Sequence, residues 1–360
     1  MPKLSIDKPL LPLFRKFINE IKKGRHLQTN GNRIKKASIE NYGYLELLLT
    51  KFSTEKKFKI RVKNTSALTK KQFEDEKKYW KNFYFEFTNY LYDDLDHHDN
   101  YVGRMMKLLR SFFNYLNNEK GMNVGFFHRK FYTPSEEPGI VVLTPERLNY
   151  MVNNKAIEKD LSPDLKEVKD VFVFGCLVAL RFSDLMALKK TNLETVNNRV
   201  YLNVQSKKTQ TYTKVKLPEY AIAIAAKYAK HYRNNFLPTF NKAFMNKKVK
   251  LVMEKYGFTE PVVLTKQKRG VPVPLYKNTK SKTLYRFCDA VTTHTMRRTA
   301  ITTMLSLGMN EQTVRQISGH AANSKEFFRY VAFAQTYIDH EIDSMHKKLD
   351  QKKLEFAAEI

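Results

Sequence analysis

The sequence predicts a mainly helical protein with a small antiparallel sheet, built from two domains. The 360 residues are enough for two domains of ordinary size. Apolar residues recur at helical spacing through most of the chain, whereas the alternation typical of a strand is confined to 200–204 and 212–217. Hydrophobic residues make up 42% of the chain, which provides for packed cores and excludes disorder of the whole chain.

The first half predicts a small helical domain over residues 36–125. Three segments within it carry apolar residues at helical spacing: 37–51, 71–91 and 101–116. Residues 1–35 are basic, with apolar patches interrupted by glycines, and predict an N-terminal arm. Residues 126–142 contain Pro134, Pro138 and Gly139 and predict a linker.

The second half predicts a mixed domain over residues 143–338. Thr144 supplies a capping hydroxyl and Pro145 suits the first helical position, and a buried helix is expected to follow and to end near Leu188. Four later segments read as helices: 220–232, 241–256, 292–307 and 310–318. Residues 339–360 alternate charged and apolar side chains, so we expect a tail helix that packs on a neighbouring subunit.

The charge of the chain is strongly positive and unevenly distributed. Sixty-four Lys and Arg against 36 Asp and Glu give a formal charge of +28. Residues 201–300 alone hold 21 basic and 4 acidic side chains, a difference of 17. Like charges at this density repel unless a polyanion neutralises them, so we expect a nucleic-acid partner and strongly salt-dependent binding. A membrane surface is disfavoured because no basic amphipathic helix with an aromatic apolar face accompanies the charge.

Three features of the sequence argue against other classes of protein. The longest apolar stretch, 171–180, is about half the roughly 20 residues of a membrane span. The first residues lack the apolar region of a secretory leader. Two cysteines, Cys176 and Cys288, do not make a disulfide framework or a cysteine zinc site. The expected location is the cytoplasm, at the nucleoid.

An acidic segment at 93–99 has the residue types of a metal site. Its sequence is Asp-Asp-Leu-Asp-His-His-Asp. It lacks the glycine and the spacing of a calcium loop and lies between two predicted helices. We therefore expect a solvated acidic loop and no metal.

Two arginines and a histidine stand where buried helices meet polar residues. Arg181 directly follows the apolar run, a costly place for a cation unless an anion compensates it, and pairing with Asp184 is the alternative. His294 and Arg297 are three residues apart and share one face of a helix. Each of these patterns is weak by itself.

Three further patterns complete the set. Gly319 can end a helix and leave His320 at an exposed corner, ten residues before Tyr330. The turn between the two predicted strands carries Lys207 and Lys208, which are either solvated or able to reach a phosphate.

Together these side chains suit chemistry at a phosphodiester. Fixed cations lower the barrier by neutralising the charge that develops on the non-bridging oxygens. A tyrosine with an ordinary pKa near 10 needs a neighbouring base or a cationic field to attack at neutral pH. The ester that it forms is still a phosphodiester, so the step is reversible and no cofactor, ATP or metal is expected.

In its motif order the chain resembles the tyrosine recombinase (phage integrase) family. That order is Arg, hairpin Lys, His-x-x-Arg, Gly-His and Tyr, and this chain has every member of it between Arg181 and Tyr330, over about 150 residues. The resemblance implies a two-domain tyrosine recombinase architecture, with a helical, SAM-like core-binding domain and a mixed α/β catalytic domain. It also implies that Arg181 and Arg297 hold the scissile phosphate and that Lys208 protonates the leaving 5′ oxygen.

The remaining implied roles concern the nucleophile and its neighbours. By resemblance, Tyr330 is the nucleophile, His294 serves in acid–base work and His320 orients the phosphate. The implied function is site-specific DNA recombination through a 3′-phosphotyrosyl intermediate, carried out on double-stranded DNA by a homotetramer, with accessory DNA-bending or directionality factors. The integrase of a mobile element is the expected role. A dimer-resolving recombinase of the same family and a catalytically inactive DNA-binding regulator are the alternatives.

The sequence departs from the family pattern at three places. Val178-Ala179-Leu180 stands where the family usually has Thr-Gly-Leu before the first arginine. The spacing from His320 to the tyrosine is one residue longer than the commonest, which leaves Tyr337 as a rival nucleophile. Lys207 is likewise a rival of Lys208.

Overall fold

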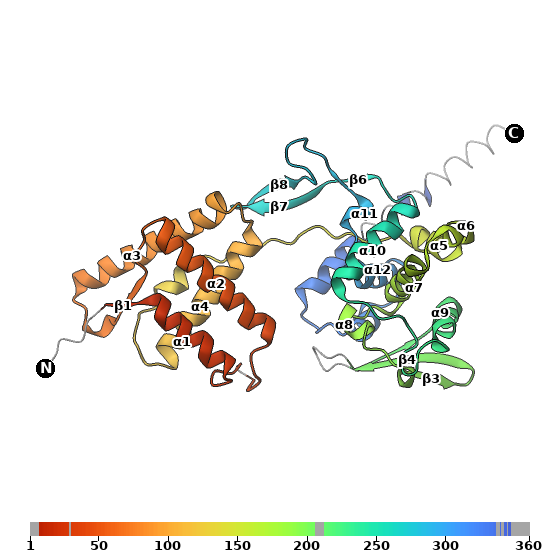
Figure 1. Cartoon of the computed structure of the whole chain (residues 1–360), viewed down its shortest axis with the longest axis horizontal. Helices are drawn as coiled ribbons and strands as arrows, with labels where there is room; N and C mark the ends of the chain where they lie inside the picture. The colour runs from red at the N-terminus through yellow and green to blue at the C-terminus, as the bar shows by residue number, and fades with distance from the viewer. Residues whose placement is uncertain are drawn as a thin grey trace. The chain divides into compact units, whose positions relative to one another are not determined.

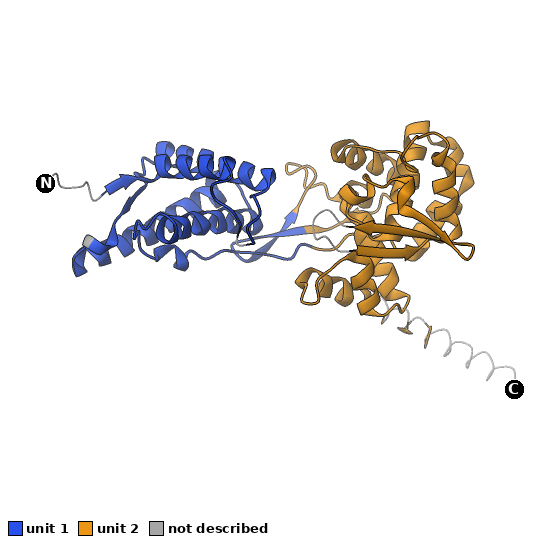
Figure 2. Cartoon of the chain, turned by 90° about the horizontal axis from the view of Figure 1, so that it is seen from below, with its two compact units in different colours: residues 1–138, 265–274 blue, residues 139–264, 275–360 orange. Residues whose placement is uncertain are grey.

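The computed structural model describes residues 7–28, 30–205, 212–335, 339, 342–343 and 345–346, and these fold into two compact units (Figure 1). Unit 1 consists of residues 1–138 together with 265–274, and unit 2 of 139–264 together with 275–360 (Figure 2). None of the described helices is long and apolar enough to cross a membrane. Lys207, Lys208, Tyr337 and most of the predicted tail at 339–360 lie outside the described residues.

Unit 1 is helical around an aromatic core. Its helices are α1 (Leu10–Lys22), α2 (Lys36–Glu55), α3 (Lys70–Asn89) and α4 (Asp99–Asn118), with short helical turns η1 (Thr65–Ala67), η2 (Tyr90–Asp94) and η3 (Phe127–Lys130). Strands β1 (Asp7–Pro9) and β2 (Arg61–Lys63) pair antiparallel. A capping box starts α3, because Thr69 and Gln72 each accept a backbone N–H of the other. Trp80, Phe83 and Phe113 are fully buried and in ring contact.

Residues 10–22 differ from the arm expected over 1–35. They form α1, and Leu10, Phe14 and Phe17 are completely buried in the core of unit 1. Their spacing of four and three residues places them on one helix face, and the glycines that suggested an arm come only after the helix ends. Part of the expected linker also differs, because Phe131 is buried in the same core.

A hairpin from the second half of the sequence belongs to unit 1. Strands β7 (Leu264–Lys268) and β8 (Val271–Leu275) pair, and the two residues between them, Arg269 and Gly270, both have positive φ, as a tight two-residue hairpin turn requires. The backbone N–H groups of these two residues donate to Asp99 at 2.7 and 2.8 Å.

The acidic segment at 93–99 contacts the hairpin, and the expectation of a solvated loop holds for the exposed Asp93 and Asp96 but not for Asp99. Asp99 is 2% exposed and also accepts from the Tyr92 hydroxyl at 2.7 Å. The Arg269 guanidinium pairs with Asp93 at 2.7 Å, and the Lys268 ammonium pairs with Asp96 at 2.6 Å. Within the described part of the chain, no group of three or more His, Cys, Asp or Glu could hold a metal ion.

Replacing Asp99 by Asn should loosen the hairpin. The variant loses the charge of a buried carboxylate that accepts hydrogen bonds from two backbone N–H groups. Each hydrogen bond to a charged group contributes about 1.5–3 kcal/mol to stability. Hydrogen exchange of the Arg269 and Gly270 amides should therefore become at least about tenfold faster. Asp96→Asn is the matched control, because the Asp96 side chain is 83% exposed and such pairs contribute little. Equal amide protection in both variants would contradict the proposed anchoring by Asp99.

Unit 2 combines a helical layer with a three-stranded sheet. Its helices are α5 (Pro145–Asn153), α6 (Lys155–Asp160), α7 (Pro163–Val178), α8 (Phe182–Leu185), α9 (Glu219–Ala229), α10 (Lys242–Lys255), α11 (Phe287–Ala290), α12 (Thr293–Ser306) and α13 (Glu311–Ser318), and a further helix covers 325–335. A 3₁₀ turn, η4 (Lys190–Asn192), precedes the antiparallel sheet of β3 (Leu193–Val196), β4 (Arg199–Gln205) and β5 (Tyr212–Lys216). Short strands β6 (Pro261–Val262) and β9 (Tyr285–Arg286) also pair. The predicted mainly helical fold with a small antiparallel sheet is confirmed.

The buried helix α7 fixes the helix that carries the His-x-x-Arg motif. A Cβ atom on Gly175 would lie 2.5 Å from the Met296 sulfur, so α7 and α12 pack closely here and a larger residue would require the Met296 side chain to move. The helix expected to run to Leu188 ends instead at Val178, because Ala179 turns the chain in a left-handed conformation with φ of +53°. These two features set where Arg181 and Arg297 lie relative to each other.

Candidate active site

The break after α7 brings Arg181 to the start of α8. Ala179 occupies the left-handed region that favours glycine, at a cost of about 1–2 kcal/mol for a residue with a Cβ. Its carbonyl oxygen accepts a hydrogen bond from the Arg297 guanidinium at 2.8 Å. The strained turn is therefore held by the second arginine of the predicted site.

Arg297 is a buried cation that joins three parts of the site. Its side chain comes from α12 and the residue is 3% exposed. One guanidinium nitrogen donates to Ala179, and the other donates to the His320 Nε2 at 3.1 Å. Burial, and then the positive charge of Arg181, lower the pKa of Arg297 to about 10, so it is still charged at neutral pH. Two neighbouring guanidiniums repel each other, and an anion bound by both would relieve that cost.

His320 is held as a neutral imidazole. Gly319 ends α13 with φ of +62°, and the turn directs His320 toward Arg297. Because Nε2 accepts from the guanidinium, Nδ1 carries the proton and donates to the Ser318 hydroxyl at 2.8 Å. That hydroxyl donates in turn to the Val314 carbonyl at 2.7 Å. Burial, and then the charge of Arg297, lower the pKa of His320 to about 4.

Tyr330 lies beside His320, with the ring centroids 5.9 Å apart. Tyr330 is only 2% exposed, and its hydroxyl donates to the Glu326 carboxylate at 3.2 Å. The His294 Nε2 lies 3.5 Å from the same carboxylate oxygen. Burial, and then the charge of Glu326, raise the pKa of Tyr330 above its ordinary value.

Five of the six predicted site residues are thus described, and contacts link four of them: Arg297, His320, His294 and Tyr330, the last two through Glu326. Arg181 is close enough for its charge to lower the pKa of both Arg297 and His320. Lys208 lies outside the described residues. Strand β5 contacts the helix that precedes His320, because the Thr213 hydroxyl donates to the Gln316 carbonyl of α13 at 3.3 Å.

Sequence reasoning missed two members of this cluster. Glu326 precedes Tyr330 by four residues, so helical spacing alone would have placed its carboxylate on the same face. Ser318 precedes His320 by two residues across the helix-ending glycine, and no spacing rule indicates its contact with the imidazole.

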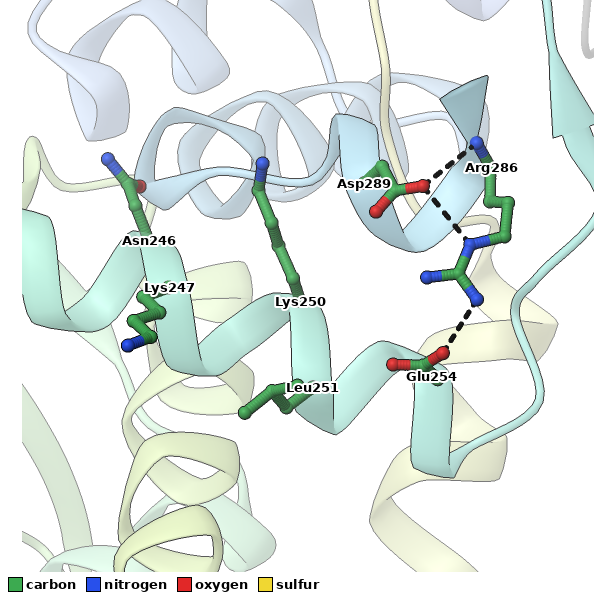
Figure 3. Close-up of a pocket in the computed structure, with 7 residues that line it drawn as sticks. All are labelled: Asn246, Lys247, Lys250, Leu251, Glu254, Arg286 and Asp289. Carbon is green, nitrogen blue, oxygen red and sulfur yellow. Dashed lines mark hydrogen bonds and ion pairs between the residues drawn. The ribbon is translucent and has the colours of Figure 1, made fainter. Parts of the chain in front are cut away.

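A basic pocket of about 430 Å³ adjoins the start of α12 (Figure 3). Lys247 and Lys250 of α10 line it, as does Arg286, whose guanidinium is tied to Asp289 at 3.1 Å and to Glu254 at 2.6 Å. Asn246 beside them accepts from the Thr293 backbone N–H at 2.8 Å, which fixes the residue before His294. The pocket therefore places the exposed Lys247 and the half-buried Lys250 next to the His-x-x-Arg helix.

Comparisons with known proteins agree with this geometry. Residues 142–336 match the model of the phage integrase family. The XerH site-specific recombinase, in a post-cleavage complex with a palindromic difH substrate, shares 12% identity at a TM-score of 0.60, covering 91% of this chain and 84% of that chain. A lambda integrase dimer bound to a COC′ core site shares 10% identity at a TM-score of 0.59, covering 90% and 77%.

A third solved structure is also similar in fold to this chain. The Tn1549 transposon integrase, in complex with a circular intermediate DNA, shares 14% identity at a TM-score of 0.52, covering 89% of this chain and 94% of that chain. Among curated proteins, none matches the sequence. The predicted two-domain architecture is confirmed by these likenesses, which at such low identity concern the fold alone.

Proposed function

The chain belongs to the phage integrase family, and on that basis we propose that it is a site-specific recombinase that cuts and rejoins duplex DNA through a 3′-phosphotyrosyl link. The observation that carries the proposal is the meeting of Arg297, His320 and Tyr330 in one site. In this proposal unit 1 is the core-binding domain and unit 2 the catalytic domain. The predicted arm at 1–35 is not retained as a separate part, because α1 belongs to the core of unit 1.

The two arginines bind the non-bridging oxygens of the scissile phosphate. Arg297 is held in place by Ala179 and His320 before any substrate binds, so little reorganisation is needed when charge develops on the phosphorus oxygens. Arg181 supplies a second planar guanidinium, which can donate to two phosphate oxygens at once. His320 acts through Arg297, because its Nε2 accepts from the guanidinium and so orients the group that binds the phosphate.

Tyr330 attacks the phosphorus. The bond from the phenolic oxygen to phosphorus forms and the bond from phosphorus to the 5′ oxygen breaks. His294 takes the phenol proton, and Lys208 gives a proton to the leaving 5′ oxygen. The number of phosphodiester bonds does not change, so the reverse reaction rejoins the strand without an energy source.

The partners follow from the same chemistry. Exchange between two duplexes requires four strand cuts, and one nucleophile per subunit then requires four subunits, so we propose a homotetramer on double-stranded DNA. The basic stretch at 201–300 supplies positive charge for phosphate contacts, and Lys247 and Lys250 belong to it. Accessory DNA-bending or directionality factors stay a prediction.

We further propose that the chain is the integrase of a mobile element. Its likeness in fold to the integrase of a transposon and to that of phage lambda supports this role. The DNA that flanks the encoding locus would then carry the repeats on which the enzyme acts.

The experiment for this proposal uses a nicked duplex that spans such a flanking repeat. After strand cleavage the short fragment beyond the nick diffuses away, so the covalent intermediate accumulates. A protein–DNA band that resists denaturation is expected, and it should persist in EDTA. DNA binding without any covalent band would favour the catalytically inactive regulator, and loss of cleavage in EDTA would indicate a metal-dependent nuclease.

A further inference from the structure

One carboxylate oxygen stands between the proposed nucleophile and His294. The Glu326 Oε1 accepts from the Tyr330 hydroxyl at 3.2 Å, and the His294 Nε2 lies 3.5 Å from the same atom. Glu326 and Tyr330 are four residues apart on the helix at 325–335, so backbone geometry favours this contact. The Glu326 side chain is 52% exposed and can move without disturbing the core.

Glu326 is poorly suited to accept the phenol proton. The hydrogen bond from His294, opposed by burial, lowers the pKa of Glu326 to about 2, whereas the pKa of Tyr330 is raised from 10.0. Both shifts act in the same direction, so the proton stays on the phenol and does not move to the carboxylate. The negative charge of Glu326 also opposes formation of the phenolate.

We propose that Glu326 is a positioning residue that holds the Tyr330 hydroxyl beside His294 in the DNA-free protein and releases it when the scissile phosphate binds. This inference rests on the proposed function, because the releasing group is the phosphodiester of DNA. The phosphate is an anion and repels the Glu326 carboxylate, while it attracts His294 and the two arginines. Binding of the substrate therefore removes the group that keeps the phenol protonated and turned away from attack.

The charges that face the phenol come from several elements. Glu326 on its own helix raises the pKa of Tyr330, and Arg297 and Arg298 on α12 lower it. His294 on α12 approaches the same carboxylate, and the neutral His320 after α13 faces the ring. Removing the charge of Glu326 leaves the positive field of the two arginines less opposed at the phenol, so the phenol should ionise at lower pH.

The first measurement titrates the phenol in the DNA-free full-length protein. Tyrosines labelled with ¹³C at Cζ report ionisation by NMR, and the signal of Tyr330 is the one lost in Tyr330→Phe. In Glu326→Gln the pKa of Tyr330 should fall, whereas it should not change in Glu219→Gln. Glu219 is exposed in the first turn of α9, so this control changes the net charge equally at a distant place.

The second measurement is the second-order rate constant for formation of the covalent complex on the nicked duplex. Glu326→Gln should raise it about 3- to 30-fold over Glu219→Gln at neutral pH, because one charged hydrogen bond of the resting protein no longer has to break. The pH profile of this constant reports ionisations of the free protein, so its alkaline inflection should move to lower pH with the NMR pKa.

An unchanged pKa of Tyr330 in Glu326→Gln would overturn the inference. A tenfold or greater loss of cleavage in that variant would also overturn it, because a general base or a supporting contact would lose activity when neutralised. If the wild-type protein forms no covalent complex on any flanking repeat, the proposed function fails. The phenol titration would still decide whether Glu326 holds Tyr330.

Discussion

Replacing Tyr330 by Phe should abolish the covalent protein–DNA complex and leave DNA binding intact. The substitution removes only the attacking oxygen, since the phenyl ring still fills a place that is 2% exposed. The hydrogen bond to Glu326 is lost as well, but that carboxylate is half exposed and water can satisfy it. Removal of a catalytic nucleophile lowers cleavage by at least about 10⁴-fold.

Denaturing electrophoresis measures the covalent complex, and a gel-shift titration measures binding. Tyr337→Phe is the matched control, because it makes the same change in the rival tyrosine and should keep the covalent band. A band that survives in Tyr330→Phe and disappears in Tyr337→Phe would move the nucleophile to Tyr337.

Replacing Arg297 by Lys should lower the cleavage rate by about 10²- to 10³-fold, the effect of removing one preorganised donor at a developing charge. The guanidinium donates in two directions, to the Ala179 carbonyl at 2.8 Å and to the His320 Nε2 at 3.1 Å. A lysine ammonium is a point charge on a flexible stem and cannot fill both positions while also binding phosphate. An unpaired buried carbonyl at Ala179 would in addition reduce the free energy of unfolding by about 1–3 kcal/mol.

Single-turnover cleavage and denaturant unfolding separate these two effects. Arg147→Lys is the control, because Arg147 lies in α5 and pairs with Glu260 at 2.6 Å, away from the predicted site. It should change the cleavage rate less than about twofold. Retention of more than a third of the wild-type rate in Arg297→Lys would contradict a preorganised phosphate site.

The sequence was sufficient to predict the order of the site residues but not their contacts. His294 and Arg297 could be placed on one helix face from spacing alone, because the helix is regular. The contact between Arg297 and the Ala179 carbonyl requires α12 to pack against α7, as it does at Gly175, which no local pattern reveals. The left-handed turn falls at Ala179, where the family usually has glycine, but the alanine itself gives no local sign of such a turn.

Two differences in unit 1 have separate causes. Residues 10–22 were expected to belong to an arm because glycines interrupt the basic and apolar patches of 1–35, although the apolar residues of the helix at Leu10–Lys22 already have helical spacing. The acidic segment at 93–99 was read as solvated because its partners, Lys268 and Arg269, lie more than 160 residues away along the chain. Local composition describes a segment well only when its partners are also local.

The central claim is that Tyr330 becomes joined to DNA, and peptide mapping of the covalent complex tests it most directly. The complex formed on the nicked duplex is digested with protease and nuclease, and the peptide that carries the residual nucleotide is sequenced by mass spectrometry. The modified residue should be Tyr330, with the nucleotide attached through its 3′ phosphate. A nucleotide on Tyr337, on any other side chain, or on a 5′ phosphate would contradict the account.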